Sequence, residues 1–144
     1  MEHEGSFDVW WSAQEDKYLA LNITKQVFER FPFKNGFNKG DIMVIVGTDP
    51  EDIEVGDVIV FEANKPYPII HRVVHVWRED GKLYFRTKGD NNDRSIVAPD
   101  LNELQIDPAY YLGRAVFRIP YVGYVKIVFV DMLRAISGGL SVAR

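Results

Sequence analysis

The three histidines are the side chains of this sequence best suited to proton transfer near neutral pH. His71 lies in the run Ile69 to Trp77, which is rich in β-branched residues. A histidine that acts as a general base needs a carboxylate to fix its tautomer and orientation. Asp90 and Asp93, in the polar sequence GDNND, are the best local candidates. The alternative, that His71 is a hydrogen-bonded structural residue, stays open from these residues alone.

His71 and His75 do not have the spacing of a metal site. Four residues along a strand span about 13 Å, which is too far for one ion to bridge. The sequence also contains no cysteine, which excludes thiol catalysis, disulfides and cysteine–zinc centres. We therefore expect neither a metal nor any other cofactor.

The elements that must position these side chains are predicted to be strands. Short runs rich in Val, Ile, Phe and Tyr, bounded by Gly, Pro, Asn and Asp, are typical of strands. The four-residue link REDG after Trp77 is typical of a hairpin, which would bring the region of Asp90 opposite His71. Six strands with short connections favour a mainly β, antiparallel, barrel-like sheet. They cover residues 42–46, 57–61, 69–77, 82–87, 111–119 and 121–130.

The chain is expected to form one structural domain with three stretches, because its 144 residues suit a single core. Residues 1–37 are a mixed segment with a short helix that Thr24 caps. Residues 38–130 form the β body, and residues 131–144 form a tail or short helix. In the first stretch, Trp10 and Trp11 could either pack in the core or enter a membrane interface.

Composition and charge exclude several classes of protein. Hydrophobic residues make up 47% and charged residues 26% of the chain, as in an ordinary folded protein. The net charge of −4 and the scattered Lys and Arg residues give no surface for nucleic acid. No run reaches the roughly 20 apolar residues of a membrane-spanning helix, and the sequence MEHEGSFDVWW lacks the basic and apolar stretches of an export signal.

Five short sequences, in this order and spacing, resemble type I signal peptidases. They are GDIMV from Gly40, VGDVIVF from Val55, IHRVV from Ile70, TKGDNN from Thr87 and RIPYVGYVKI from Arg118. The resemblance covers roughly residues 38–130 and implies the barrel-like signal-peptidase fold. A histidine in the HRVV sequence, where bacterial members carry lysine, is similar to the archaeal and endoplasmic-reticulum branch. The implied activity is a serine endopeptidase that cleaves signal peptides from exported precursors after small residues.

The resemblance also implies roles for individual residues. His71 matches the general base, and Asp90 matches the aspartate of the GDN sequence. Members of this branch often carry a second aspartate about six residues later, where this chain has Ile96. Asp93 is our substitute for that residue, with Asp100 behind it.

The family holds its substrate as an added strand, which requires an exposed sheet edge. We expect Ile42, Met43 and Val44 to form this substrate-binding edge. The expected partners are precursors that carry a signal peptide, and the sequence does not indicate an oligomeric state.

The nucleophile departs from the family pattern, which places its serine in a Ser-Met-x-Pro sequence. None of the serines of this chain is followed by Met; they are Ser6, Ser12, Ser95, Ser137 and Ser141. We therefore expect the nucleophilic serine just upstream of residue 1, so that Met1, Glu2 and His3 follow it and Met1 lies near His71. This chain alone would then be inactive.

The resemblance further implies a membrane anchor ahead of residue 1 and a catalytic domain on the extracytoplasmic or lumenal side. The alternative function is a non-catalytic β module of the same fold that binds peptides or has a structural role.

Overall fold

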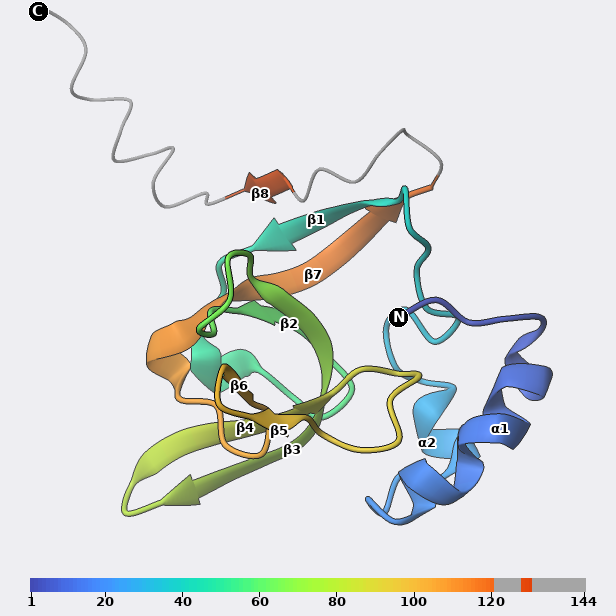
Figure 1. The fold of residues 1–144 in the computed structure, drawn as a ribbon, viewed down its shortest axis with the longest axis horizontal. Coiled ribbons are helices and arrows are strands. Elements are labelled where there is room, and N and C mark those ends of the chain that lie inside the picture. The colour runs from blue at the N-terminus through green and yellow to red at the C-terminus, as the bar shows by residue number, and fades with distance from the viewer. Residues whose placement is uncertain (121–127, 131–144) are drawn as a thin grey trace, which may run out of the picture.

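The computed structural model describes residues 1–120 and 128–130. A small helical segment, residues 6–37, lies beside a curved sheet, with the first residues of the chain between them (Figure 1). Two α-helices come first, α1 (Phe7–Leu19) and α2 (Lys25–Phe28), and short 3-10 turns follow at Pro50–Asp52 and Pro108–Tyr110. The strands are β1 (Ile42–Val46), β2 (Val58–Phe61), β3 (Ile69–Glu79), β4 (Lys82–Lys88), β5 (Val97–Ala98), β6 (Leu101–Asn102), β7 (Tyr111–Ile119) and β8 (Val128–Val130).

The helical segment is held together by aromatic side chains. The Ser6 hydroxyl caps α1 by accepting from the backbone N–H of Val9, and Thr24 caps α2 as predicted. The buried cluster consists of Trp10, Trp11, Tyr18, Ile23, Phe28 and Val74. Of the two alternatives for the tryptophans, the structure therefore has core packing.

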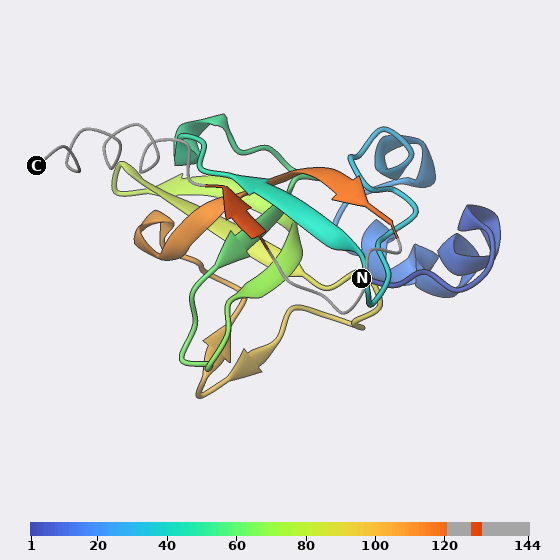
Figure 2. The same cartoon turned by 90° about the horizontal axis from the view of Figure 1, so that it is seen from above.

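The main sheet has the strand order β4-β3-β2-β7-β1-β8. Neighbouring strands of this sheet pair antiparallel, except β1 and β8, which pair parallel. The predicted mainly β, antiparallel fold is confirmed. Figure 2 shows the helices at one end of this sheet and the β5–β6 hairpin projecting from it. Of the predicted strand 121–130 only β8 is described, and the rest of it and the tail 131–144 lie outside the described residues.

The predicted hairpin joins β3 and β4. Asp80 and Gly81 have φ values of 50° and 78°, as a two-residue turn with positive φ at both central positions requires. The pairing continues along both strands, past a bulge between Val73 and His75, to Arg72 opposite Lys88. The far end of this hairpin is the place where the candidate site lies.

Neighbouring residues on a strand point to opposite faces of a sheet, and this alternation separates the polar residues of the hairpin. Arg72 and Lys88 face the helical segment, since Arg72 donates to the carbonyl of Pro32 and the Lys88 ammonium lies 4.2 Å from the Tyr18 ring centre. His71 and Thr87 face the other side, where both contact Glu103.

Candidate active site

His71 is paired with the carboxylate of Glu103. The His71 Nδ1 atom lies 2.5 Å from Glu103 Oε1. The histidine side chain is 19% exposed and that of Glu103 is fully buried, so one ring edge contacts the carboxylate inside the protein while solvent reaches the ring. Such a contact fixes the tautomer and the plane of an imidazole and stabilises its protonated form.

Glu103 is itself held in place by hydrogen bonds from its surroundings. The Thr87 hydroxyl donates to Oε1 at 2.8 Å, and the backbone N–H of Ile96 donates to Oε2 at 2.7 Å. Backbone hydrogen bonds also join Glu103 to Ile96 and to Thr87. A buried carboxylate needs such partners, and here they leave it one orientation toward His71.

The other ring nitrogen of His71, Nε2, has no hydrogen-bond partner among the described residues. It lies beside Gly89, where a methyl group in place of the glycine hydrogen would be 2.9 Å from Nε2. That distance is shorter than any normal carbon contact, so the space beside Nε2 depends on the glycine. The imidazole is therefore oriented at one nitrogen and open at the other, which is the arrangement of a general base.

Asp90, which we expected to orient the imidazole, is not hydrogen-bonded to His71; its carboxylate has other partners. The register was right, since Arg72 opposite Lys88 brings Gly89 beside His71. Asp90 follows one residue later and faces the helical segment. There it accepts from Arg72 at 2.9 and 3.0 Å and from the Tyr18 hydroxyl at 3.0 Å.

The ion pair of Asp90 and Arg72 is fully buried. Burial alone would raise the pKa of Asp90, but the Arg72 guanidinium and the hydrogen bond with His3 together outweigh it and hold that pKa well below its usual range. Burial likewise raises the pKa of Tyr18, which stays a hydrogen-bond donor. Arg72 also donates to the carbonyls of Pro32, Phe33 and Gly56, so this network joins the helical segment to the hairpin.

Asp93 and Asp100, the substitutes expected for a second aspartate, also lie apart from His71. Asp93 is exposed and pairs with Lys17 at 2.7 Å, and the hydrogen bond from Lys17 lowers its pKa. Asp100 pairs with Lys65. Glu103 is the residue that sequence reasoning missed, because nothing in its flanking sequence LNELQ indicates a buried carboxylate.

The first residues of the chain lie close to this site. The Met1 sulfur accepts a hydrogen bond from the backbone N–H of Asp90 at 3.4 Å, one residue from Gly89. The Met1 side chain also belongs to the apolar cluster that includes Ile70, the neighbour of His71. Burial lowers the pKa of the Met1 α-amino group.

The serines of the described residues make other hydrogen bonds. Ser6 caps α1, and the Ser12 hydroxyl donates to the carbonyl of Val9 at 2.7 Å. The buried Ser95 hydroxyl donates to the carbonyl of Thr87 at 2.6 Å. None of these three hydroxyls is hydrogen-bonded to His71, and the remaining serines lie outside the described residues. In the described part of the chain, no group of three or more acidic or histidine side chains could hold a metal ion.

The expected substrate-binding edge is partly occupied. β1 pairs with β7 on one side, and on the other side β8 covers it from Val44 to Val46. Ile42 and Met43 lie before that pairing begins. A cavity of about 250 Å³ lies between this part of β1 and the chain start, lined by Met1, Glu2, Phe37, Asn38, Lys39, Asp41, Met43 and Ile70.

Comparison with curated proteins shows which known proteins this chain is similar to. The chain is a homologue of the catalytic subunits of signal peptidase, and so of the endoplasmic-reticulum branch of the type I signal peptidases. The resemblance seen in the sequence is thereby confirmed.

Three relatives give the extent of the similarity. Human signal peptidase complex catalytic subunit SEC11C is 36% identical over 100 residues, which are 66% of this chain and 51% of that protein. The SEC11 subunit of Komagataella phaffii is 38% identical over 104 residues, 66% of this chain and 60% of that protein. The SEC11 subunit of Clavispora lusitaniae is 36% identical over 99 residues, which are 66% of this chain and 58% of that protein.

The chain thus spans between about half and three fifths of the length of the curated relatives it matches. No family model and no solved structure matches it significantly. No helix in residues 1–120 has the length and apolar character needed to cross a membrane.

Proposed function

We propose that this chain is the catalytic domain of a serine endopeptidase that removes signal peptides from exported precursors, with His71 as general base. The observation that carries the proposal is the buried Glu103 carboxylate at Nδ1, combined with an Nε2 that lies beside the glycine Gly89 and has no hydrogen-bond partner among the described residues. A serine hydroxyl is a weak nucleophile until a base at hydrogen-bond distance removes its proton. Nε2 of His71 is the atom that would accept that proton, and Glu103 would stabilise the resulting imidazolium.

The nucleophile is proposed to be a serine bonded directly to Met1. The three serines of the described residues have other partners and are not hydrogen-bonded to His71. Met1 accepts a hydrogen bond from the N–H of Asp90, the neighbour of Gly89, and it packs on the same apolar cluster as Ile70, the neighbour of His71. A residue ahead of Met1 would therefore start from a point close to Nε2.

The substrate is proposed to bind as a strand along Ile42 and Met43 and to continue toward Met1. Among the described residues, this part of β1 lies ahead of the pairing with β8, and main-chain hydrogen bonds to a strand edge suit a peptide of varied sequence. The cavity of about 250 Å³ beside it is lined by the apolar side chains of Met1, Met43 and Ile70. Cleavage after small residues is proposed because the resemblance to type I signal peptidases implies it.

The site of action is proposed to be the extracytoplasmic or lumenal face of a membrane, where precursors emerge. This rests on the kinship with signal peptidase subunits. Those relatives are named as subunits of a complex, and companion subunits are therefore proposed as further partners.

The test is to extend the chain by one serine ahead of Met1 and treat it with an acylating serine-protease probe. We expect stoichiometric labelling of the added serine and cleavage of a precursor-derived peptide. His71→Ala should slow both by about 10² to 10⁴-fold, as loss of a general base does.

Two variants are matched controls. One is a chain extended by alanine instead of serine, and the other is His75→Ala, which changes an exposed histidine on the same strand as His71. Labelling that persists without His71, or that falls on Ser6, Ser12 or Ser95, would contradict the proposal. Peptide binding without any labelling would indicate the non-catalytic module instead.

A further inference from the structure

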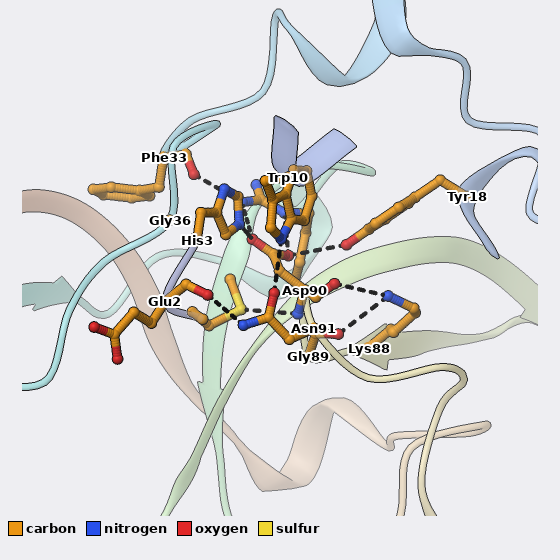
Figure 3. Close-up of polar contacts among 12 residues, drawn as sticks. Glu2, His3, Trp10, Tyr18, Phe33, Gly36, Lys88, Gly89, Asp90 and Asn91 are labelled. Carbon is orange, nitrogen blue, oxygen red and sulfur yellow. Dashed lines mark hydrogen bonds and ion pairs between the residues drawn. The ribbon is translucent and has the colours of Figure 1, made fainter. Parts of the chain in front are cut away.

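The loop that follows β4 holds the first three residues of the chain. The Nε2 atom of His3 lies 2.8 Å from Asp90 Oδ2, and both side chains are almost fully buried. The Asn91 amide donates to the carbonyl of Glu2, and the N–H of Asp90 donates to the sulfur of Met1. Figure 3 shows these contacts converging on the loop from one short segment. Each of the first three residues therefore has a contact with Asp90 or Asn91.

His3 is also fixed by an aromatic ring. Its imidazole stacks on the indole of Trp10, with ring centres 3.6 Å apart and planes 6° from parallel. Trp10 in turn donates its indole N–H to the Asn91 side-chain oxygen at 2.7 Å. The remaining ring nitrogen of His3, Nδ1, is buried without a hydrogen-bond partner in the described part of the chain. A buried polar atom left unpaired lowers stability, so the contact of Nε2 with Asp90 and the stacking on Trp10 must outweigh this cost in holding His3 in place.

Asp90 is a rigid partner for His3 because its other contacts are already made. Arg72 binds both carboxylate oxygens, and Tyr18 donates to Oδ1. Arg72 is also the direct neighbour of His71 in β3. A continuous path of buried contacts thus leads from His3 through Asp90 and Arg72 to the strand that carries His71.

A second close contact lies on the opposite side of the segment. Gly36 has a φ of +67°, and a methyl group there would be 2.1 Å from the Met1 carbonyl oxygen and 2.6 Å from the His3 ring. Glu2 and Gly36 form an isolated bridge, and the N–H of Phe37 donates to the Met1 carbonyl at 3.1 Å. The first residues therefore lie between Gly36 and the loop after β4 and contact both.

We propose that His3 is a positioning residue, whose contact with Asp90 fixes the chain start relative to His71. The proposal rests on the function proposed above, in which the attacking hydroxyl is bonded to Met1. Small displacements of a reacting group cost large factors in rate, so this contact acts on the chemical step. Loss of the contact should lower kcat more than it raises KM.

The experiment uses the chain extended by one serine and compares His3→Ala, His3→Gln and the exposed control His75→Ala. One readout is hydrogen exchange of the Phe37 amide, which reports docking of Met1 without any need for activity. The other is the rate of labelling of the added serine under single-turnover conditions. For His3→Ala we expect both Phe37 exchange at least 10-fold faster and labelling at least 10-fold slower. His3→Gln, whose amide can still donate to Asp90, should recover part of both, and His75→Ala should match the parent.

Gly36→Ala provides a second variant, because it forces the segment away from Gly36 without changing any of the side chains that contact Asp90. It should also speed Phe37 exchange and slow labelling. Unchanged labelling in His3→Ala and Gly36→Ala, while Phe37 exchange accelerates, would overturn the positioning role. Unchanged Phe37 exchange in folded His3→Ala would overturn the docking itself. Labelling that does not depend on His71 would instead defeat the proposed function, and the exchange readout would still decide whether His3 holds the segment.

Discussion

At the scale of single residues, the site depends on which carboxylate lies at His71. Glu103 occupies that place at 2.5 Å, and its other hydrogen bonds come from Thr87 and the N–H of Ile96. Ile96 stands where the family resemblance implies a second aspartate. Its backbone N–H binds the Glu103 carboxylate, so a longer side chain from a later segment brings a carboxylate to the same neighbourhood.

Replacement of this carboxylate by an amide tests its role. Glu103→Gln keeps the size of the side chain but removes the charge that stabilises the imidazolium and selects its tautomer. We expect labelling of a serine added before Met1 to slow by about 10² to 10⁴-fold, with a melting temperature close to that of the parent. Asp93→Asn, which alters an exposed carboxylate, is the control and should have no effect. Equal rates for the two variants would exclude Glu103 as the orienting residue.

Sequence alone could identify His71 but not its partner, for a physical reason. A histidine within a β-branched run is visible in the sequence, and hairpin counting correctly brought Gly89 beside it. The contact with Glu103 depends on how the chain after β6 folds back on β4, and no local pattern specifies that. Gly89 lies opposite His71, and side chains alternate between the two faces of a strand. Continued by one residue, this alternation would have placed Asp90 on the face opposite to His71.

At the scale of elements, the strands were more predictable than the helices. β1 and β7 have the predicted bounds, because β-branched runs between turn residues are distinctive. α1 was expected only as a mixed segment. Its buried residues Trp10, Trp11, Gln14 and Tyr18 do recur at helical spacing, but they include aromatic residues with modest helix propensity. Local propensity alone does not specify α1. Contacts of its side chains with Asp90, Asn91 and Phe28 stabilise it.

The buried ion pair of Asp90 and Arg72 lies where the hairpin meets the helical segment, and it should contribute strongly to the stability of the fold. Asp90→Asn leaves the Arg72 guanidinium buried without a matching charge, which typically costs about 3 to 5 kcal/mol of stability. Asp93→Asn on the surface should change stability by less than about 0.5 kcal/mol. Urea unfolding of both variants measures the difference. Because the pKa of Asp90 is lowered in the folded state, this stabilisation is present above the unfolded pKa near 3.8 and is lost as the pH falls through the folded value. Equal losses in the two variants would contradict the structural role of Asp90.

At the scale of the whole molecule, the helical segment and the β body are joined by polar contacts as well as by packing. Arg72 on β3 donates to the carbonyls of Pro32 and Phe33, and Val74 on the same strand packs in the aromatic cluster. We propose that both parts unfold together as one domain, since removal of the helical segment would expose the ion pair of Arg72 and Asp90 and take away its hydrogen bonds with Tyr18, Pro32 and Phe33. The proposed active site lies along this junction, so its geometry depends on the stability of the entire domain.

Lys88 gives this junction a pH dependence that can be measured on the whole protein. Its ammonium lies over the Tyr18 ring and donates to the carbonyls of Gly89 and Asp90 at 3.2 Å. Burial lowers the pKa of Lys88 from 10.5 to about 8. Between those two values the unfolded chain binds more protons than the folded one, so unfolding becomes less favourable as the pH rises. The charge on Lys88 thus lowers stability below pH 8, and this cost is relieved above it.

We expect the stability of the parent protein to rise relative to Lys88→Met between pH 7 and pH 10, by on the order of 2 kcal/mol. Denaturant unfolding at several pH values measures this difference. The raised pKa of Tyr18 lowers stability as the pH approaches 10, since the unfolded chain then loses that proton first. This effect is common to both proteins and cancels in the comparison. Parallel stability curves for the two proteins would mean that Lys88 keeps an ordinary pKa, and hence that solvent reaches its ammonium at the junction.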